Sequence, residues 1–325
     1  MSRKIYIDRL KGLAMLLVVI GHIYSKCLYP GSDVQCTIAS VLQTFRMPLF
    51  MFLSGVVIAA APSLKKCLQK TILFLMPAIV VGFVFCIYTG WTFVEFINSG
   101  TKHGYWYLFV LTLFYWNLIA YRWIPEKWGS VMFLLLGCIE YVILSNLGSI
   151  IPKNVYDILC YQRIVAYFPF FMLGHYINKY KLFSYFEGSQ YVHGLSLLLI
   201  IVIACYSHFL LPSYYIITPL AIIAFLMSAF PFREGETSFV EKKLEEIGKY
   251  TLDIYIYHYF FIVLIKLKPI GEWFSLTNNP FIEFVFVLLL SLLVLGSSIL
   301  VGKIIKSNKY IENIVYGKYI LNIIK

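Results

Sequence analysis

The chain has 325 residues, of which 60% are hydrophobic and 13% charged, and its mean hydropathy is +0.79. This composition excludes an ordinary soluble domain and predicts a membrane protein. The formal net charge of +11 indicates membrane topology and attraction to an anionic inner leaflet rather than binding to nucleic acid.

Apolar runs long enough to cross a hydrocarbon core of ~30 Å recur along the whole chain. We expect an all-α fold, a polytopic bundle of about ten transmembrane helices. These helices are expected to form a single domain over residues 1–325 with no appended soluble domain. The expected spans are 6–28, 38–61, 71–90, 104–122, 129–147, 162–179, 192–211, 214–231, 250–268 and 279–304.

Lysine and arginine are divided unevenly between alternate connecting segments. With a cytoplasmic N-terminus, twenty of the 27 basic residues fall on the inner side, six on the outer side, and Arg46 within a span. The positive-inside rule therefore predicts that both termini are cytoplasmic. Asp8, Arg9 and Lys11 interrupt the first apolar stretch, so no cleavable signal peptide is expected.

The first apolar segment carries an ionisable residue near each end. Lys11 and His22 are eleven residues apart, which places them within about 20° on one helical face and ~16 Å apart along the axis. Ionisable groups inside a membrane helix are costly and therefore indicate function. We expect a cation near the inner surface and an imidazole deeper in the bilayer, aligned along one wall of a cavity.

The second apolar segment contains Arg46 at a depth similar to that of His22. An arginine at such a depth costs ~2.5–3.5 kcal/mol on insertion scales unless it faces water or a partner. Pro48 leaves a backbone carbonyl one turn earlier without its usual donor, which adds polarity near Arg46. Arg46 therefore either serves a functional site or locks helices together through a salt bridge.

Further polar residues follow in the next segments. Lys66 and Lys70 are four residues apart, so they share one helical face at the inner side. His103 and Trp106 are expected at the outer mouth of the same cavity. Glu140 in the fifth span and Arg163 at the outer start of the sixth are candidates to pair within it.

The span over 250–268 contains His258 near its middle. His258 lies about 140° from Asp253 around the helix, whereas Tyr257 shares the face of Asp253. A catalytic histidine and a histidine satisfied by hydrogen bonds within the bundle are equally consistent with this pattern. Three other histidines are interpreted as structural: His175, His193 and His208.

The seven cysteines show no Cys-x-x-Cys or Cys/His metal spacing. Cys27 and Cys36 fall near the first outer loop, where they either form a disulfide in an oxidising compartment or remain two thiols. The longest polar segment, 233–249, is predicted to be a cytoplasmic connector with a short helix.

Three kinds of chemistry can be compared with these residues. Metal-dependent hydrolysis requires clustered His and carboxylate ligands, and the best-placed histidines lack that spacing. Serine hydrolysis requires a motif such as Gly-x-Ser-x-Gly, which does not occur. Acyl transfer from a thioester requires a base, an oxyanion stabiliser and an anion site, which His22, Arg46 and the inner lysines supply.

Several motifs then resemble the bacterial acyltransferase-3 family of integral-membrane O-acyltransferases. The stretch from Ile7 to His22 resembles the family's opening, whose hallmark is a basic residue, ten others and a histidine. The segment 45–55 resembles the second-helix signature, and Lys66-x-x-x-Lys70 resembles an Arg-x-x-x-Arg motif. Weaker blocks follow in the family's order at 106–108, 168–174 and 255–258. Lysine replaces the commoner arginine at 11, 66 and 70, which removes bidentate phosphate binding.

The resemblance implies a short, surface-polysaccharide type of O-acyltransferase in the inner membrane of a bacterial cell. It would move an acyl group, with acetyl as the expected case, from acetyl-CoA to a hydroxyl of a carbohydrate or lipid-linked glycan. His22 would act as general base, directly or through a covalent acyl intermediate, with Arg46 beside the oxyanion or the acceptor. Lys11, Lys66 and Lys70 would bind the coenzyme A phosphates, and no metal is implied. The remaining cavity candidates are Asp8, His103, Trp106, Glu140, Arg163, Tyr257 and His258.

A membrane transporter or polysaccharide exporter is the alternative from a different functional class. Its usual pointer, broken helices in related halves of the chain, is not evident in the sequence. A sensor or scaffold explains Lys11 and His22 poorly. Coenzyme A binding would separate the enzyme from the transporter.

Overall fold

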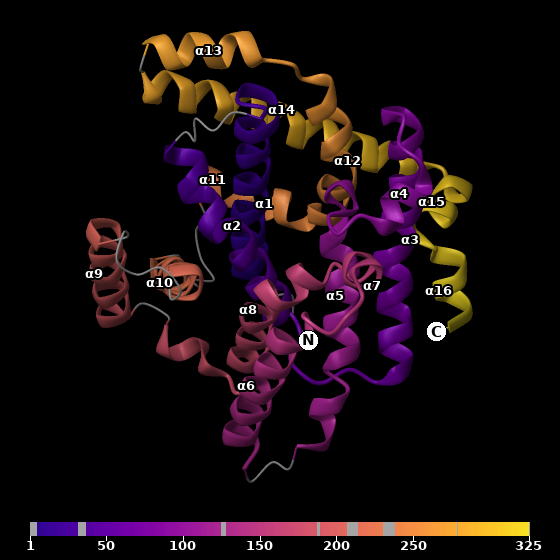
Figure 1. The fold of residues 1–325 in the computed structure, drawn as a ribbon, viewed down its shortest axis with the longest axis vertical. Coiled ribbons are helices and arrows are strands. Elements are labelled where there is room, and N and C mark those ends of the chain that lie inside the picture. The colour runs from indigo at the N-terminus through magenta and orange to yellow at the C-terminus, as the bar shows by residue number, and fades with distance from the viewer. Residues whose placement is uncertain are drawn as a thin grey trace. The chain divides into compact units, whose positions relative to one another are not determined.

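The computed structural model describes residues 5–31, 37–124, 128–186, 189–206, 214–229, 238–277 and 279–324. Helices account for the regular structure of these ranges and no strand occurs in them, which confirms the all-α fold class (Figure 1). The chain divides into two compact units. Unit 1 comprises Met1–Leu53, Lys181–Ile254 and Phe260–Ser298, and unit 2 comprises Ser54–Tyr180, Tyr255–Tyr259 and Ile299–Lys325.

Some helices belong wholly to one unit, and α2, α12 and α14 run from one unit into the other. The helices with residues in unit 1 are α1 (Ile5–His22), the π-helical η1 (Ile23–Leu28), α2 (Thr37–Val56), η5 (Leu182–Tyr185), α9 (Gln190–Tyr206), α10 (Tyr214–Ala229), α11 (Phe239–Lys249), α12 (Thr251–Leu264), α13 (Lys268–Thr277) and α14 (Pro280–Ser307). The helices wholly in unit 2 are α3 (Leu64–Thr89), α4 (Phe93–Asn98), η2 (Lys102–Gly104), α5 (Trp106–Asn117), η3 (Ala120–Trp123), α6 (Gly129–Leu147), α7 (Lys153–Ile158), α8 (Tyr161–Lys179), α15 (Lys309–Tyr316) and α16 (Lys318–Ile324).

In unit 1, α11 packs against the N-terminal half of α1. The helix begins at a capping box, in which Glu241 N donates to Ser238 Oγ at 3.2 Å and Ser238 N donates to Glu241 Oε2 at 2.8 Å. Two glycines then allow the backbones to touch, because a Cβ at Gly12 would overlap the Leu244 carbonyl. Gly248 meets the Asp8 carbonyl in the same way. The short helix predicted within the polar connector is therefore confirmed.

In unit 2, the end of α2 is held by side chains of α8. His175 Nδ1 lies 2.6 Å from the carbonyl oxygen of Ile58, and Asn178 Nδ2 donates to the carbonyl of Val56 at 2.6 Å. The last carbonyls of a helix lack partners inside it, so side chains from a neighbour can satisfy them. This arrangement supports the structural interpretation of His175.

Within the described ranges, five helices are long and apolar enough to cross a membrane: Tyr6–Leu28, Ile38–Val56, Leu64–Thr89, Gly129–Leu147 and Pro280–Ser307. The bent pair α12 and α13, with 81° between the two helices, makes a sixth if it forms one span. The other predicted spans coincide with shorter or less apolar helices: α5, α8, α9 and α10. The number of about ten crossings and the cytoplasmic termini therefore stay predictions.

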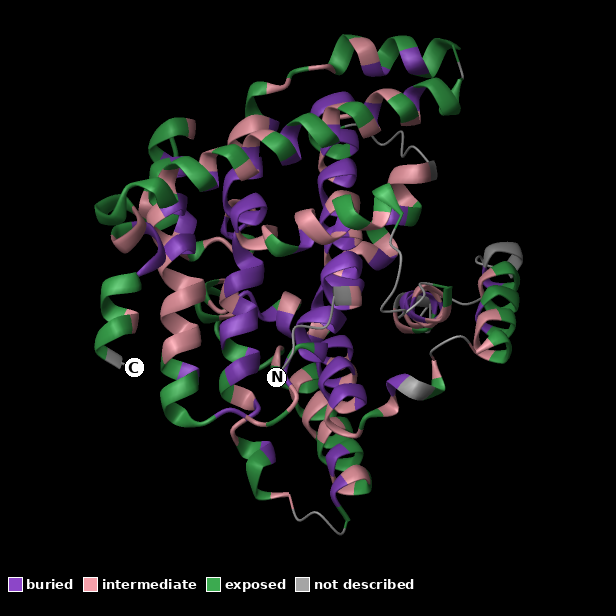
Figure 2. Ribbon diagram, turned by 180° about the vertical axis from the view of Figure 1, so that it is seen from behind, coloured by how far each residue is buried: buried purple, intermediate pink, exposed green. Residues whose placement is uncertain are grey.

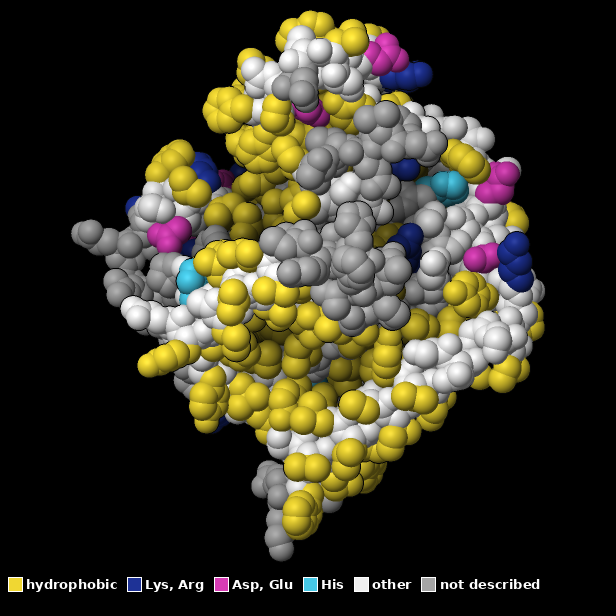
Figure 3. All heavy atoms as spheres, turned by 60° about the vertical axis from the view of Figure 1, so that its left-hand side comes forward, with side chains coloured by type: hydrophobic (Ala, Val, Ile, Leu, Met, Phe, Trp, Pro, Cys, Tyr) yellow, Lys and Arg dark blue, Asp and Glu magenta, His cyan; other side chains and the backbone are white. Residues whose placement is uncertain are grey.

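Burial differs between the apolar helices. In the span Tyr6–Leu28, 61% of the most apolar window is buried, against 6% for Gly129–Leu147. Figure 2 shows buried residues along much of α1 and exposed residues over most of α9. Hydrophobic side chains also cover much of the face seen in Figure 3. Lipid tails would cover such surfaces, so α1 is suited to a protein interior and α6 to a lipid contact.

Candidate active site

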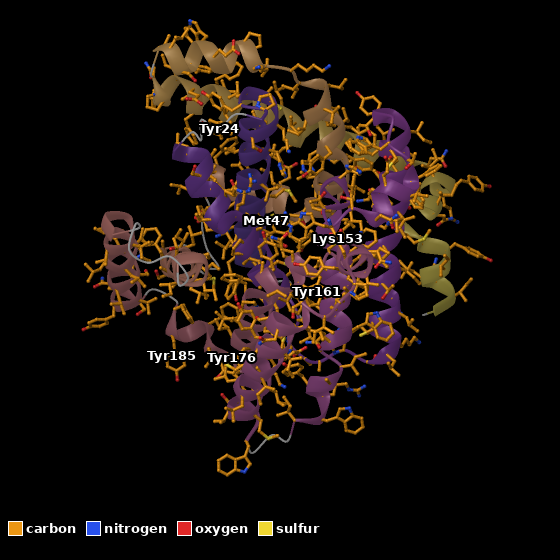
Figure 4. The ribbon with its side chains drawn as sticks, viewed as in Figure 1. Tyr24, Met47, Lys153, Tyr161, Tyr176 and Tyr185 are labelled. Carbon is orange, nitrogen blue, oxygen red and sulfur yellow. The ribbon has the colours of Figure 1, made fainter. Side chains whose placement is uncertain are left out.

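His22 stands where the α-helical part of α1 ends and η1 begins. The helix is continuous from Ile5 to His22, so Lys11 and His22 share one face within about 20°, as the spacing predicts. A π-helical turn is rare and is frequently found at functional sites. Ser25 in this segment donates a hydrogen bond from Oγ to the carbonyl of Gly21 at 2.8 Å. Figure 4 labels Tyr24 of η1 and Met47, the residue after Arg46 on α2.

Arg46 extends from α2 to the backbone of α1. A Cβ built at Gly21 would overlap the Arg46 guanidinium, so the cation lies directly against this glycine. Because Gly21 precedes His22, the guanidinium reaches the backbone of α1 one residue before His22. This contact places Arg46 against the helix that carries His22, and both residues belong to unit 1.

Lys66 and Lys70 lie in the first two turns of α3, within unit 2. Ser63 caps this helix, since Lys66 N donates to Ser63 Oγ at 3.3 Å. The Lys70 ammonium lies 5.6 Å from the ring centroid of Phe74 and 5.9 Å from that of Tyr115. A helix N-terminus with two lysines on one face is a favourable place for an anion.

Glu140 and Arg163 were expected to pair, and the structure places them with other partners. Tyr121 donates a hydrogen bond from its hydroxyl to Glu140 Oε2 at 2.6 Å. The Arg163 guanidinium instead lies over the ring of Trp106, at 5.3 Å from its centroid. The prediction of this ion pair is wrong because Tyr121 of η3 contacts the carboxylate, whereas the guanidinium of Arg163, at the start of α8, lies over Trp106.

Two more predicted residues lie in α12. His258 is fully buried, its Nδ1 lies 2.9 Å from the carbonyl oxygen of Tyr255, and its ring lies 4.3 Å from that of Tyr259. Tyr257 has its hydroxyl 3.4 Å from that of Tyr316. The contact with its own helix concerns Nδ1 alone, so it is consistent with both the structural and the catalytic interpretation of His258.

The outer-mouth candidates belong to two neighbouring aromatic clusters in unit 2. Trp106 begins α5 and stacks on Tyr167, with 5.1 Å between centroids and 14° between planes. His103 lies in η2, and its ring centroid is 4.3 Å from that of Trp91.

The remaining predictions concern cysteines, histidines and metals. The Cys27 thiol is free and lies 3.6 Å from the carbonyl oxygen of Ile262, while its possible partner Cys36 lies outside the described residues. His193 Nδ1 lies 3.2 Å from Ser228 Oγ, and His208 is also outside the described residues. Within the part of the chain that the structure describes, no group of His, Cys, Asp and Glu has the arrangement of a metal site.

Sequence reasoning missed two features of this site. The π-helical turn after His22 has no recognised sequence signal. The close approach of Arg46 to α1 had one signal, a glycine at position 21 inside an otherwise bulky apolar run. Glycine in a helix interior is destabilising, so it often marks a place where another group comes close.

Residues 4–300 match a family model described as an acyltransferase domain. No curated protein and no solved structure matches the chain. The matched region contains both His22 and Arg46, together with the five apolar helices long enough to span a bilayer, apart from the last residues of α14. The chain is therefore a multi-pass membrane protein that belongs to the acyltransferase-3 family.

Proposed function

We propose that this membrane acyltransferase moves an acyl group, with acetyl as the expected case, from acyl-CoA to a hydroxyl of a surface carbohydrate or lipid-linked glycan. The enzyme would act in the inner membrane of a bacterial cell, with the donor at the cytoplasmic face. The observation that carries the proposal is the contact of the Arg46 guanidinium with Gly21, next to His22. The same helix carries Lys11 on the face of His22.

His22 acts as the general base in this reaction. A neutral imidazole accepts the proton of the acceptor hydroxyl while the hydroxyl oxygen attacks the thioester carbonyl carbon. A new carbon–oxygen bond forms, and the carbonyl oxygen becomes an oxyanion. The Arg46 guanidinium, held against Gly21, stabilises this negative charge, and such stabilisation is usually the largest single contribution to catalysis.

Collapse of the tetrahedral intermediate completes the transfer. The carbon–sulfur bond breaks, the coenzyme A thiolate leaves, and the proton on the imidazolium passes to the thiolate sulfur. The enzyme is then back in its starting protonation state. Lys66 and Lys70 bind phosphates of the carrier as point charges, and the N-terminus of α3 adds its dipole to them. Lys11 on α1 is a further candidate for this role.

A labelled-donor assay tests the role of His22. Purified protein in lipid nanodiscs is given radiolabelled acetyl-CoA and base-treated surface glycan from cells that lack the gene. We expect the His22→Ala protein to lose transfer by about 10²-fold or more, because general base catalysis contributes this much. His193→Ala is the matched control, since His193 Nδ1 lies 3.2 Å from Ser228 Oγ and this histidine has no role in the proposed reaction. Near-normal transfer by folded His22→Ala protein would refute the assignment.

Coenzyme A binding distinguishes the enzyme from a transporter. We expect coenzyme A to raise the unfolding temperature of the wild-type protein. The Lys66→Ala/Lys70→Ala protein would need about tenfold more ligand for the same shift. No shift at millimolar coenzyme A would favour the transporter.

A further inference from the structure

The turn between α4 and α5 has an unusual backbone. Lys102, His103 and Gly104 have consecutive positive φ values of 45°, 47° and 106°. Lysine and histidine rarely adopt this left-handed region, and such residues persist only where the surrounding structure holds them. Strained backbone of this kind concentrates at functional sites and ligand clamps.

The side chain of Lys102 makes hydrogen bonds that hold this turn in place. Lys102 is 1% exposed, and its ammonium donates hydrogen bonds to the carbonyls of Ile97 at 2.6 Å, Ser99 at 2.8 Å and Asp157 at 3.1 Å. These carbonyls lie in or just beyond the last turns of α4 and α7. All three ammonium hydrogens are satisfied, so the buried charge ties the turn to two helix ends.

Tyrosines of α12 hold the same turn from another side. Tyr255 donates from its hydroxyl to the carbonyl of Gly104 at 2.7 Å and accepts from the amide of Tyr107 at 3.1 Å. The Tyr259 ring occupies the place where a Cβ on Gly104 would lie. The turn is therefore fixed before any ligand arrives.

This rigid turn presents His103 to an exposed tryptophan. The ring centroids of His103 and Trp91 are 4.3 Å apart with 43° between planes, and Phe96 stacks on His103 from a centroid distance of 6.3 Å. Trp91 is 49% exposed and follows Gly90, whose φ of 78° ends α3. His103 Nε2 is buried and has no hydrogen-bond partner among the described residues.

Glu95 places a carboxylate on the same loop. Its Oε2 accepts from the amide and from the hydroxyl of Thr92, both at 2.8 Å, and Oε1 accepts no hydrogen bond from the described residues. The hydrogen bond from the Thr92 backbone holds the pKa of Glu95 below its usual range, so the carboxylate is ionised and accepts only. Burial lowers the pKa of His103, so this ring is neutral at neutral pH.

We propose that Trp91, His103 and Glu95 form a platform that binds a neutral pyranose ring of the acceptor glycan. The apolar face of a sugar ring packs on an aromatic face, and a few placed polar groups orient its hydroxyls. The Glu95 carboxylate accepts from these hydroxyls and would repel an acidic sugar. This inference rests on the proposed function, because the sugar belongs to the proposed acceptor.

The test measures glycan affinity without the donor. Base-treated surface glycan from cells lacking the gene is titrated calorimetrically into the full-length protein in nanodiscs. We expect Trp91→Ala to weaken binding about tenfold, the worth of one aromatic contact, and Trp91→Phe to weaken it less. Trp273→Ala is the matched control, because Trp273 is exposed to a similar extent, 52%, on α13 and outside the platform. In the transfer assay, Trp91→Ala should raise the KM for glycan about tenfold and leave kcat within about twofold.

A second variant covers the case in which Trp91→Ala fails to fold. Glu95→Gln preserves the capping box, since glutamine also serves there, and should weaken glycan binding several-fold. Glycan affinity that is the same in wild type, Trp91→Ala and Glu95→Gln would overturn the platform and leave Trp91 as an interfacial aromatic. His22→Ala should bind glycan normally. If the wild-type protein binds glycan through Trp91 but transfers no acyl group, the proposed function is refuted and the platform is supported.

Discussion

At the scale of single residues, Gly21 decides whether the Arg46 guanidinium can lie against α1, one residue before His22. The guanidinium lies where any side chain at position 21 would begin. We expect Gly21→Ala to displace Arg46 and to lower kcat by about 10²-fold, since small misplacements of catalytic groups have effects of this size. The transfer assay with labelled acetyl-CoA measures the change.

Gly194→Ala is the control for this substitution. Gly194 lies in α9 and a Cβ there meets nothing within 4 Å, so the helix gains an alanine without a clash. Full activity in Gly21→Ala would show that the position of Arg46 against α1 does not matter for the reaction.

Glu95 makes the start of α4 dependent on pH. Its pKa is held below the usual value of 4.5 by hydrogen bonds from Thr92. A lowered pKa in the folded state means that the carboxylate contributes stability above about pH 4.5, and this contribution is lost as pH falls through the lowered pKa. We expect the amides of α4 to lose protection from hydrogen exchange in this acid range.

Glu95→Gln provides the comparison at each pH, because an amide keeps the capping geometry but does not titrate. The difference in protection between the two proteins should therefore change with pH below about 4.5. A constant difference from pH 6 to pH 3.5 would contradict the role of the carboxylate.

At the scale of helices, the contact between α1 and α11 depends on glycines, which have no side chain to keep the two backbones apart. The backbone of α11 touches Gly12, and Arg9, which is 3% exposed, has Nη1 3.5 Å from Glu241 Oε1. We expect Gly12→Ala to force α11 away from α1 and to destabilise the protein by about 1–3 kcal/mol, the usual range for overpacking. Thermal unfolding in detergent monitors the loss.

Gly296→Ala is the matched control, since a Cβ at this position of α14 has open space around it. Alanine should stabilise or leave unchanged a helix in which it meets no neighbour. An equal unfolding temperature for Gly12→Ala and wild type would mean that α11 is not closely packed.

At the scale of the whole molecule, the distribution of lysine and arginine predicts the orientation. We expect a green fluorescent protein fused after Lys325 to fluoresce, because it folds in the cytoplasm. Alkaline phosphatase fused after Thr101 should be active, because it requires the outer side. The reverse pattern would invert the proposed positions of donor and acceptor, since the inner lysines would then lie outside.

The sequence by itself determined the all-α fold class, from its apolar runs, and the family, from its motifs. Hydrophobic stretches of this length have no stable alternative to helices in a bilayer, because every backbone group must find a partner within its own segment. That Lys11 and His22 share one helical face also followed from the helical repeat alone, and α1 is continuous between them.

Contacts between segments distant in sequence were decided only by the tertiary structure. Glu140 bonds Tyr121 rather than Arg163, and Lys102 ties the turn after α4 to α7. The helical repeat predicts which residues share a face of a helix, but it does not predict which other helix or loop packs against that face. The contact of Arg46 with Gly21 and the left-handed turn at His103 therefore became visible only once the helices were packed together.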